Sequence, residues 1–555
     1  MAEIYTVHFD DYTPDILPTH QYGTDWPVVY IIDNNEEAYV GETLDVSVRT
    51  RQHLQNNDRR RLTEISIISN DDFNKSVILD LEGFLIRHMS ADDRFRLQNG
   101  NNGLRQHNYY NRISYEDQFR EVWDKLIDLN LAKQTLAEIE NSDIYKYSPY
   151  TSLSTDQYLA MSQIIRSVSE AKDAYKPKNT TIVRGGPGTG KTVLAVHLMK
   201  LLASRDTEQL IDAEEDEVIA SISENLKRLP RDMKIGLVIP MQSLRETLTK
   251  VFEHTNGLNS KMILKPNDIP SGPDYDLLIV DEAHRLRQRK ALSQYPAFDK
   301  NNRLLGLGKD GTELDWIMMK SKCRVLFYDQ LQSVKPADVD AGRFLTLQSD
   351  DSTNMLELKT QFRCQGGNDY ITYIRSIFSS NPPKDKMTFP EYTVKLFSDC
   401  GAMTDAIKNL DMEFGLSRTV AGYAWPWISK SDKDAYDIML DNRYYKWNTV
   451  SCDWVNHPGS VDEIGCIHTI QGYDLNYCAV IFGYEIDYDR TAKKITVNKN
   501  KYWDNLGKSV GTKDPEVLKE YVLNIYKTLM TRGIRGTYVY VCNEGLREYL
   551  KQYID

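Results

Sequence analysis

Residues 184–192 read R-G-G-P-G-T-G-K-T, and this stretch decides the fold of most of the chain. It matches the pattern G-x4-G-K-[ST], in which glycines let backbone N–H groups turn inward around phosphates. Residues 180–184 are typical of a strand and residues 193–203 of a helix with an apolar face, as this motif requires. Lys191 should reach the β- and γ-phosphates and Thr192 should bind magnesium. We therefore predict a phosphate-binding loop made of Gly185, Gly186, Pro187, Gly188, Thr189, Gly190, Lys191 and Thr192.

A second motif follows at the end of a buried strand. Residues 277–280 are apolar, and residues 281–284 read D-E-A-H. A carboxylate placed there can hold the magnesium ion, and its neighbour can orient the attacking water. We assign the first role to Asp281 and the second to Glu282. With the phosphate-binding loop, these residues predict hydrolysis of a nucleoside triphosphate.

The bulk composition is that of a globular protein with more than one domain. The chain has 555 residues, 41% hydrophobic and 27% charged, and no apolar run approaches the length of a membrane span. Seven scattered cysteines without a C-x-x-C pair indicate reduced thiols and a cytoplasmic location. The net charge of −12 argues against nonspecific coating of nucleic acid, although not against a local basic groove. Two basic clusters, residues 59–61 and 284–290, fit either a phosphate-backbone contact or a solvated surface.

The order of predicted elements gives an α/β protein with a separate N-terminal part. Residues 1–112 predict a small α/β domain with strands at 28–33, 38–42 and 64–69. Residues 113–150 look helical and are interpreted as a connector. From residue 151, strands alternate with helical stretches, as in parallel sheets covered on both faces. The strands expected there lie at residues 235–239, 277–280, 324–328, 419–424, 479–482 and 537–541.

Further motifs follow the phosphate-binding loop in a fixed order. They are I-P-M-Q-S-L at 239–244, Y-D-Q-L-Q at 328–332, Q-F-R-C at 361–364, H-T-I-Q-G-Y-D at 468–474 and L-M-T-R-G-I-R at 529–535. The series resembles superfamily 1 helicases, and more narrowly the helicase-like domain of the Schlafen proteins and their bacterial relatives, over residues 150–550. This resemblance implies two RecA-like lobes, residues 151–345 and 346–555, with ATP bound between them.

The helicase resemblance also implies roles for single residues. Those that would bind or sense ATP are Gln157 at the adenine, Gln332 at the γ-phosphate, and Arg363 and Arg532 as arginine fingers. Gln471 and Gly472 would couple the nucleotide to the nucleic-acid groove. The last motif reads G-I-R at 533–535 where many helicases have A-R-x, which makes Arg535 a second, shifted candidate. Little room remains for inserted subdomains, so strand unwinding stays an open question.

The N-terminal part carries a polar set without a nucleotide motif. Tyr30 and Tyr39 lie on adjacent predicted strands, Arg49 and His53 lie one helical turn apart, and Glu82 lies in a later helix. With Asn99 after that helix, the arrangement resembles the GIY-YIG nuclease family over residues 26–103. V-V-Y at 28–30 departs from G-I-Y at its first position, and Y-V-G at 39–41 is close to Y-I-G.

The nuclease resemblance implies one-metal hydrolysis of a phosphodiester. Glu82 would bind the divalent ion, Mg²⁺ or alternatively Mn²⁺, and Arg49 would clamp the scissile phosphate. Tyr30 would help to deprotonate the attacking water, which Tyr39 would orient. His53 is assigned either a catalytic or a structural role.

Together these motifs predict an enzyme with two activities. We expect a nucleic-acid-stimulated ATPase that requires ATP and Mg²⁺, joined to an endonuclease that cleaves DNA in preference to RNA. We expect no membrane partner, and a partner protein or a homo-oligomer remains open. By analogy, such a fusion suits prokaryotic defence against phage or foreign DNA. The alternatives are a DNA repair nuclease-helicase and an ATP-driven nucleic-acid sensor whose N-terminal domain only binds.

Overall fold

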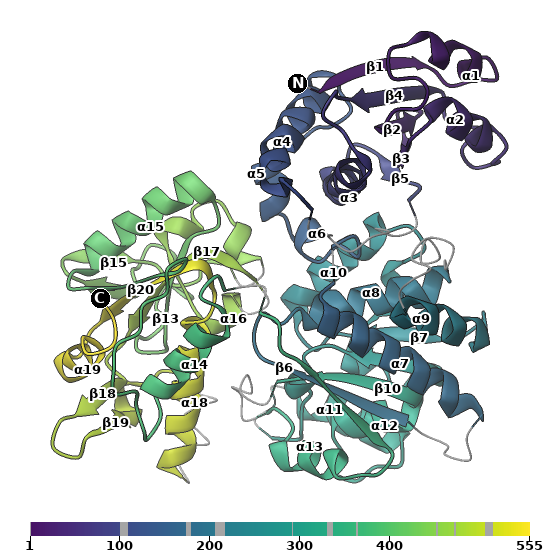
Figure 1. Cartoon of the computed structure of the whole chain (residues 1–555). Coiled ribbons are helices and arrows are strands. Elements are labelled where there is room, and N and C mark those ends of the chain that lie inside the picture. The colour runs from purple at the N-terminus through teal and green to yellow at the C-terminus, as the bar shows by residue number, and fades with distance from the viewer. Residues whose placement is uncertain are drawn as a thin grey trace. The chain divides into compact units, whose positions relative to one another are not determined.

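The protein is described by a computed structural model (Figure 1) that covers residues 2–99, 109–151, 153–173, 179–205, 217–290, 292, 294–329, 337–361, 364–450, 453–470, 473–504 and 514–555. The chain divides into two compact units. The first comprises Met1–Ser169, Thr192–Asp232 and Glu246–Ile263, and the second comprises Glu170–Lys191, Met233–Arg245 and Leu264–Asp555. No helix among the described residues is both long and apolar enough to cross a membrane. The predicted site residues Gln332, Arg363, Gln471 and Gly472 lie outside the described residues.

The N-terminal module contains a five-stranded sheet in the order β1-β4-β2-β3-β5. Its strands are β1 (Glu3–His8), β2 (Val28–Asp33), β3 (Glu37–Thr43), β4 (Glu64–Ser69) and β5 (Arg96–Leu97). β2 pairs antiparallel with β3 and β4, and β1 pairs antiparallel with β4. The strands predicted at 28–33, 38–42 and 64–69 are confirmed, whereas the edge strand β1 and the short β5 were not expected.

Both faces of this sheet are covered (Figure 1). Val29, Ile31 and Val40 belong to a core with α3 (Lys75–Asp92), while Tyr30 and Tyr39 belong to a second core that includes Val46 of α2 (Val46–Leu54). A strand buried on both faces reads as a continuous apolar run, which is the pattern V-V-Y-I-I of β2. The short α1 (Thr13–Ile16) and the 3₁₀ turn Leu17–Thr19 lie beside the second core.

The segment interpreted as a connector packs into the N-terminal core instead of merely linking two domains. It forms α4 (Arg112–Asp128), α5 (Leu136–Asn141) and α6 (Asp143–Lys146). Its buried side chains join the core that contains α3: Phe119, Val122, Trp123, Leu126, Leu136, Ile139 and Tyr150. The spacing of the first four is an apolar stripe at helical period, so α4 needs a partner surface along its length. The core of the module therefore extends to Tyr150.

The second unit contains a six-stranded sheet in the order β11-β6-β10-β9-β7-β8. The strands are β6 (Asn179–Gly185), β7 (Ile235–Val238), β8 (Ile263–Leu264), β9 (Tyr275–Val280), β10 (Ser321–Tyr328) and β11 (Thr353–Leu358). The pairs β11–β6, β6–β10, β10–β9 and β9–β7 are all parallel. Since parallel strands end at the same edge, the loops after β6, β9, β10 and β7 gather there, where ligands bind in open α/β sheets.

A second parallel sheet follows in the order β12-β20-β17-β13-β16. Its strands are β12 (Thr393–Phe397), β13 (Arg418–Ala421), β16 (Ile464–Gly465), β17 (Leu475–Phe482) and β20 (Gly533–Val541). Two antiparallel hairpins accompany it, β14 (Ile438–Leu440) with β15 (Arg443–Tyr445), and β18 (Ile486–Asp489) with β19 (Lys494–Val497). These two parallel sheets confirm the alternating pattern expected after residue 151.

The helices between the strands complete an α/β architecture. The first unit holds most of α7 (Thr155–Asp173), most of α8 (Lys191–Ser204), α9 (Glu217–Arg228) and most of α10 (Gln242–His254). The second unit holds α11 (Tyr295–Leu304), α12 (Glu313–Lys320), α13 (Ala341–Gln348), α14 (Gly367–Ile377), α15 (Cys400–Phe414), α16 (Ile467–Ile470), α18 (Pro515–Leu529) and α19 (Glu544–Leu550).

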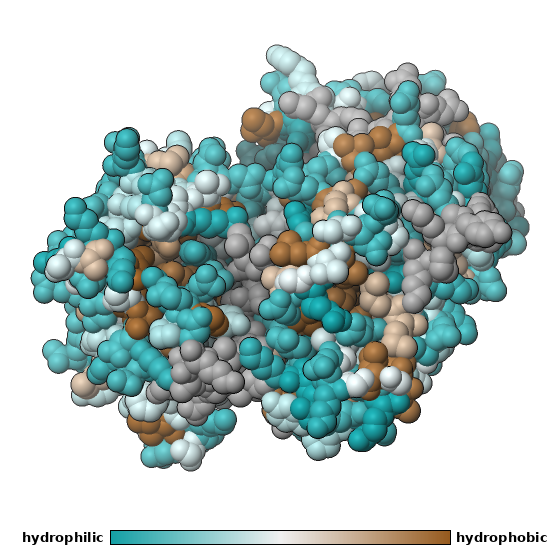
Figure 2. Space-filling model, turned by 90° about the horizontal axis from the view of Figure 1, so that it is seen from below, coloured by the Kyte–Doolittle hydropathy of each residue, from teal (hydrophilic) through white to brown (hydrophobic). Residues whose placement is uncertain are grey.

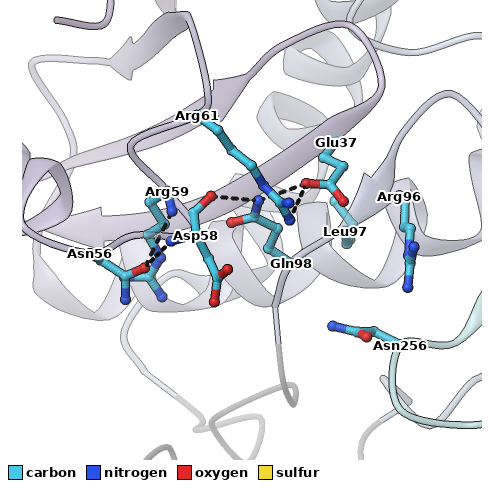
Figure 3. A pocket seen from close by; sticks show the side chains of 9 residues that line it. All are labelled: Glu37, Asn56, Asp58, Arg59, Arg61, Arg96, Leu97, Gln98 and Asn256. Atoms are coloured by element: carbon cyan, nitrogen blue, oxygen red, sulfur yellow. Dashed lines mark hydrogen bonds and ion pairs between the residues drawn. The ribbon is translucent and has the colours of Figure 1, made fainter.

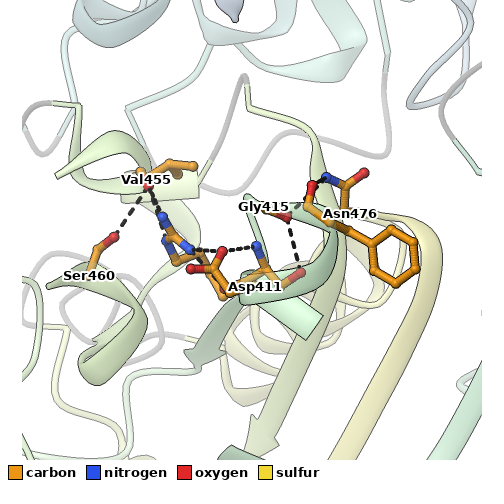
Figure 4. A network of polar contacts seen from close by, with 8 residues as sticks. Asp411, Gly415, Val455, Ser460 and Asn476 are labelled. Atoms are coloured by element: carbon orange, nitrogen blue, oxygen red, sulfur yellow. Dashed lines mark hydrogen bonds and ion pairs between the residues drawn. The ribbon is translucent and has the colours of Figure 1, made fainter. Parts of the chain in front are cut away.

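A buried polar network fixes the second parallel sheet at the start of β13 (Figure 4). Arg418 donates from Nη1 to Asp411 Oδ1 at 2.6 Å, and from Nε and Nη2 to the Val455 carbonyl at 3.0 and 2.6 Å. Asn476 donates to the carbonyls of Phe414 and Gly415 at 2.8 and 3.0 Å. Buried polar groups must find partners in the protein. Here the partners lie on different elements, so the network joins the end of α15 to β13 and β17.

We expect Trp123→Ala to destabilise the N-terminal module. The Trp123 side chain is fully buried, and its Nε1 donates to the Gln134 carbonyl at 3.0 Å. Removing a buried indole costs about 3–5 kcal/mol. Hydrogen exchange of the β2 and β4 amides should accelerate in this variant, while the exposed neighbour change Asp124→Ala should leave them unchanged. Unchanged protection in Trp123→Ala would show that α4 is not part of this core.

We also expect Gly41→Ala to disturb the strand pair β2–β3. Gly41 lies opposite Tyr30, and a Cβ added there would lie 2.3 Å from Tyr30 Oη. Forcing an extra methyl group into a packed site costs roughly 1–3 kcal/mol. Thermal unfolding should report this loss, whereas Gly308→Ala is the matched control because its Cβ meets no atom within 4 Å. Equal stability of the two variants would contradict the observed register.

Candidate functional site

The phosphate-binding loop connects β6 to α8. Gly188 and Gly190 have φ values of +80° and +72°, a backbone region that favours glycine. At Gly185 a Cβ would lie 2.4 Å from Thr189 Oγ1, so a side chain there would fill the loop. The glycines are therefore required by the conformation, and the loop forms the concave backbone that cradles phosphate.

Lys191 points at the backbone of this loop. Its Nζ donates to the carbonyls of Gly185 and Gly186, both at 2.8 Å, and the side chain is 5% exposed. Thr192 follows as the second residue of α8 and is half-buried. A cation and a hydroxyl beside a glycine cradle match the chemistry of a nucleotide triphosphate with its magnesium ion.

The strand end after β9 brings a second set of polar groups to the same edge. Asp281 is fully buried, and Glu282 adopts a left-handed conformation with φ of +50° while its N–H donates to Asp281 Oδ1 at 2.9 Å. His284 Nε2 lies 2.9 Å from Glu282 Oε2. Burial raises the pKa of the Glu282 carboxyl, but interactions with His284, Lys191 and Arg285 outweigh burial and hold that pKa below its usual range. Glu282 is thus an ionised acceptor.

His284 links this carboxylate to the next strand. The N–H of Asp329, which follows β10, donates to His284 Nδ1 at 3.4 Å. In this contact Nδ1 accepts, and Nε2 on the other side of the ring lies at ion-pair distance from Glu282. The D-E-A-H motif contained His284, but its partner on β10 could not be read from sequence.

The Q-F-R-C motif also reaches the phosphate-binding loop. Gln361 Nε2 donates to the Pro187 carbonyl at 2.5 Å. Arg375 of α14 comes close as well, because its Nη2 lies 3.8 Å from the position of a Cβ on Gly186. Arg375 belongs to no recognised motif, so sequence reasoning missed it. It is an arginine near the loop in addition to the predicted Arg363, which lies outside the described residues.

Three other predicted nucleotide residues have different surroundings. Gln157 is buried at the start of α7, where its Oε1 accepts from the Ser154 N–H at 2.9 Å. Arg532 is 2% exposed, inside the second parallel sheet's core region. Arg535 lies over the ring of Phe414 at 4.7 Å. The roles of these residues at the nucleotide stay predictions.

The predicted residues of the N-terminal module converge in one place. Tyr30 Oη lies 2.7 Å from His53 Nε2, and the ring centroids of Tyr39 and His53 are 5.1 Å apart. All three side chains are buried. They form a layer between β2, β3 and α2, which follows from the register that places Tyr30 and Tyr39 on the face covered by α2.

Arg59, which the sequence marks only as part of the basic cluster 59–61, completes this layer. Its Nη1 lies 2.8 Å from His53 Nδ1, and its guanidinium carbon lies 3.7 Å from the centre of the Tyr39 ring. Arginine only donates, so His53 Nδ1 accepts and Nε2–H donates to Tyr30 Oη. Burial, together with the charges of Arg59 and Arg49, lowers the pKa of His53 to about 3. His53 is therefore a neutral positioning group for Tyr30.

A partly exposed layer lies beside the buried one. Burial and the charge of Glu42 raise the pKa of Glu82 to about 8, with Lys75 and Arg49 opposing them. Burial lowers the pKa of Arg49, but Tyr30 and Tyr39 raise it above its usual value. Glu82 is thus a carboxyl with too little positive charge around it, which suits a divalent cation. No group of three or more His, Cys, Asp or Glu side chains in the described ranges is arranged to hold a metal ion.

Asn99 has a structural position. Its Oδ1 accepts from the Val40 N–H at 3.0 Å, and its Nδ2 donates to the Val40 carbonyl at 2.8 Å. The amide pairs with β3 as a neighbouring strand would. Its contribution to the cluster is to hold β3, the strand that carries Tyr39.

Comparisons with known proteins agree on the larger part of the chain. Residues 178–543 match the family described as Schlafen group 3, DNA/RNA helicase domain. The uncharacterized protein YPL245W of Saccharomyces cerevisiae is 27% identical over 419 residues, covering 69% of this chain and 86% of the yeast protein. A structure of Mss116p bound to single-stranded RNA and AMP-PNP covers 77% of both chains at 11% identity, with a TM-score of 0.29, too low to support an argument. With its phosphate-binding loop and D-E-A-H strand end inside the matched region, the chain belongs to the Schlafen group 3 DNA/RNA helicase domain family.

Proposed function

We propose that this protein couples a nucleic-acid-dependent ATPase to a metal-dependent nuclease. Membership in the helicase family supports the first activity. The observation that carries the second is the convergence of Tyr30, His53 and Arg59 in one hydrogen-bonded layer beside Arg49 and Glu82. These side chains belong to none of the nucleotide motifs, so the proposal assigns them a separate chemistry.

At the nucleotide site, each residue has a definable task. Lys191 neutralises phosphate charge, and the backbone of Gly185 to Gly190 donates to phosphate oxygens. Thr192 and Asp281 would hold Mg²⁺, which supplies charge neutralisation at the phosphates when bound. Glu282, an ionised carboxylate with His284 Nε2 2.9 Å from its Oε2, accepts a hydrogen bond from the attacking water. Gln361 and Arg375 approach the loop from the Q-F-R-C motif and α14.

We expect Glu282→Gln to abolish ATP turnover while ATP binding persists. An amide keeps the shape but accepts a proton far less readily, and a positioned base contributes roughly 10²–10⁴-fold to rate. Phosphate release should fall by that factor, and binding of a fluorescent ATP analogue should stay near wild type. Lys191→Ala should weaken both, whereas the exposed Glu253→Gln is the matched control. Wild-type turnover in Glu282→Gln would refute the assignment.

At the proposed nuclease site, the two layers divide the work. Glu82 would hold Mg²⁺ or Mn²⁺, an ion that stabilises the leaving oxygen when bound. Arg49 clamps the scissile phosphate by charge and paired N–H groups. Tyr30 receives the His53 Nε2–H and keeps its own hydroxyl proton for a hydrogen bond. Burial raises the pKa of Tyr30 well above its usual value and Arg49 lowers it, so loss of the Tyr30 proton depends on cations at the site.

We expect Glu82→Gln to remove Mg²⁺-dependent cleavage without changing ATP hydrolysis. The carboxylate is the metal ligand that this site offers, and an amide oxygen binds Mg²⁺ weakly. Cleavage of single-stranded, duplex and forked DNA and RNA should fall at least about 10²-fold, on the scale of a lost metal or acid–base group. Glu121→Gln on the exposed side of α4 is the control. Undiminished cleavage by Glu82→Gln would exclude the proposed nuclease and leave the binding-module alternative.

We further propose DNA as the substrate and the cytoplasm as the location. ATP hydrolysis then feeds translocation, so Lys191→Ala should reduce cleavage of long DNA and spare short oligonucleotides.

Defence against phage or foreign DNA is the proposed biological role, by analogy with nuclease–motor fusions. A repair role uses the same chemistry on damaged or branched DNA, which the forked substrates distinguish.

A further inference from the structure

A polar pocket of about 320 Å³ adjoins the buried layer of the N-terminal module (Figure 3). Its lining comes from the loop after α2, the start of β3, the strand β5 with the residue after it, and the loop after α10. The residues that carry the argument are Arg59, Arg61, Arg96, Gln98, Asp58 and Asn256. The volume lies at the lower end of the range of small-ligand sites, about 300–1,000 Å³.

Some charged side chains of the pocket are paired within the protein and others are not. Arg61 pairs with Glu37 at 2.7 Å, and Gln98 Nε2 donates to Glu37 Oε2 at 2.9 Å. Arg96, by contrast, makes no side-chain hydrogen bond or ion pair within the part of the chain that the structure describes. Figure 3 shows its guanidinium extending on the side of the pocket where Asn256 lies. One arginine therefore remains available to an anion.

The lining also offers groups that a bare anion would not use. Asp58 carries an exposed carboxylate, and Asn256 carries an amide that both donates and accepts. The Gln98 amide already donates to Glu37 Oε2 and to the Asp58 carbonyl, at 2.9 and 3.1 Å, so it shapes the wall of the pocket. A ligand with a phosphate at one end and hydrogen-bonding base or sugar edges at the other matches this mixture. Three arginines against two acids, Glu37 and Asp58, leave a net positive charge that favours such an anionic ligand.

Arg59 connects the pocket to the proposed nuclease residues. It lines the pocket, and the same guanidinium contacts His53 Nδ1 at 2.8 Å and the Tyr39 ring at 3.7 Å. A ligand in the pocket therefore lies one side chain away from the layer that orients Tyr30. The three consecutive arginines have separate tasks, because Arg60 turns away to Asp11 at 3.2 Å.

We propose that this pocket is a nucleotide subsite, which holds the nucleotide next to the one that is cleaved. Arg96 binds its phosphate, and Asp58, Arg59 and Asn256 face the rest of the nucleotide. The inference rests on the proposed nuclease, whose substrate it extends by one bound nucleotide. The subsite would give the N-terminal module a contact with the nucleic-acid strand that is separate from any contact made by the ATPase.

The test compares Arg96→Ala with Arg60→Ala in the full chain. Both remove one exposed arginine from the same module, but only Arg96 lines the pocket. Binding of labelled single-stranded DNA and RNA is measured against salt in EDTA, in a Glu82→Gln background that keeps the strand intact. Arg96→Ala should bind roughly tenfold more weakly, as for a lost charged hydrogen bond. Its slope of log affinity against log salt should fall by about 0.7, the value for one phosphate of a single strand.

Arg60→Ala should keep both the affinity and the slope. Arg96→Lys should restore the slope but not the full affinity, since lysine keeps the charge and loses the forked donors. In Mg²⁺ without the Glu82 change, Arg96→Ala should raise the KM for cleavage and leave kcat near wild type.

The outcomes separate this inference from the proposed nuclease. If Arg96→Ala and Arg60→Ala bind alike, the subsite is overturned, even when Glu82 proves essential for cleavage. If Arg96→Ala loses binding while the wild-type chain cleaves no substrate, the nuclease fails and the pocket stands as a nucleic-acid contact. If the loss of affinity in Arg96→Ala is larger for DNA than for RNA, or the reverse, the difference identifies which nucleic acid the pocket binds.

Discussion

The parallel alignment of β6, β10 and β9 is the constraint on which the nucleotide site depends. In this register Arg184 is level with Tyr328, and Leu326 is level with Val280. The residues that follow these strands therefore emerge together, although they lie far apart in the sequence. The charge of Lys191 can then act on Glu282, and the Asp329 N–H can donate to His284 Nδ1. If these strands did not end at the same edge of the sheet, the phosphate-binding loop, the D-E-A-H motif and Asp329 would not lie close together.

The polar cluster of the N-terminal module is built in a different way. Its sheet is mostly antiparallel, and the layer of Tyr30, Tyr39 and His53 is buried between one face of the sheet and α2. Burial keeps His53 neutral and Tyr30 protonated, so this layer holds geometry and does not exchange protons freely. Burial and the neighbouring charge of Glu42 raise the pKa of Glu82, so its ionised carboxylate is the destabilised group of the cluster. A carboxyl destabilised in this way is typical of functional sites, where strain is retained for binding.

Packing also bears on how the N-terminal module and the helicase-like region are joined. α4 shares a core with α3, and within the same unit Thr247 of α10 donates to Asp143 Oδ2 at 3.1 Å. His254 Nε2 lies 3.4 Å from Asp93 Oδ1. The module is therefore attached to a helix of the ATPase region by side-chain contacts, as well as by the chain itself. Such an attachment transmits position, whereas a flexible tether only raises local concentration.

The sequence alone was sufficient where chemistry is local. The phosphate-binding loop needs glycines at fixed spacing, so it was predictable from the sequence. Buried strands such as Leu277 to Val280 were predictable because they are continuous apolar runs. Tyr30, Arg49 and Glu82 were predicted as site residues from their order along the chain, and their role stays a prediction. The tertiary structure decided what depends on distant partners. Arg59 at His53 and Arg375 near Gly186 follow no local pattern, because contact across elements depends on register and packing rather than on neighbours in sequence. Trp123 likewise reads as one residue of an amphipathic helix, and only the packing of α4 on α3 shows which core it fills.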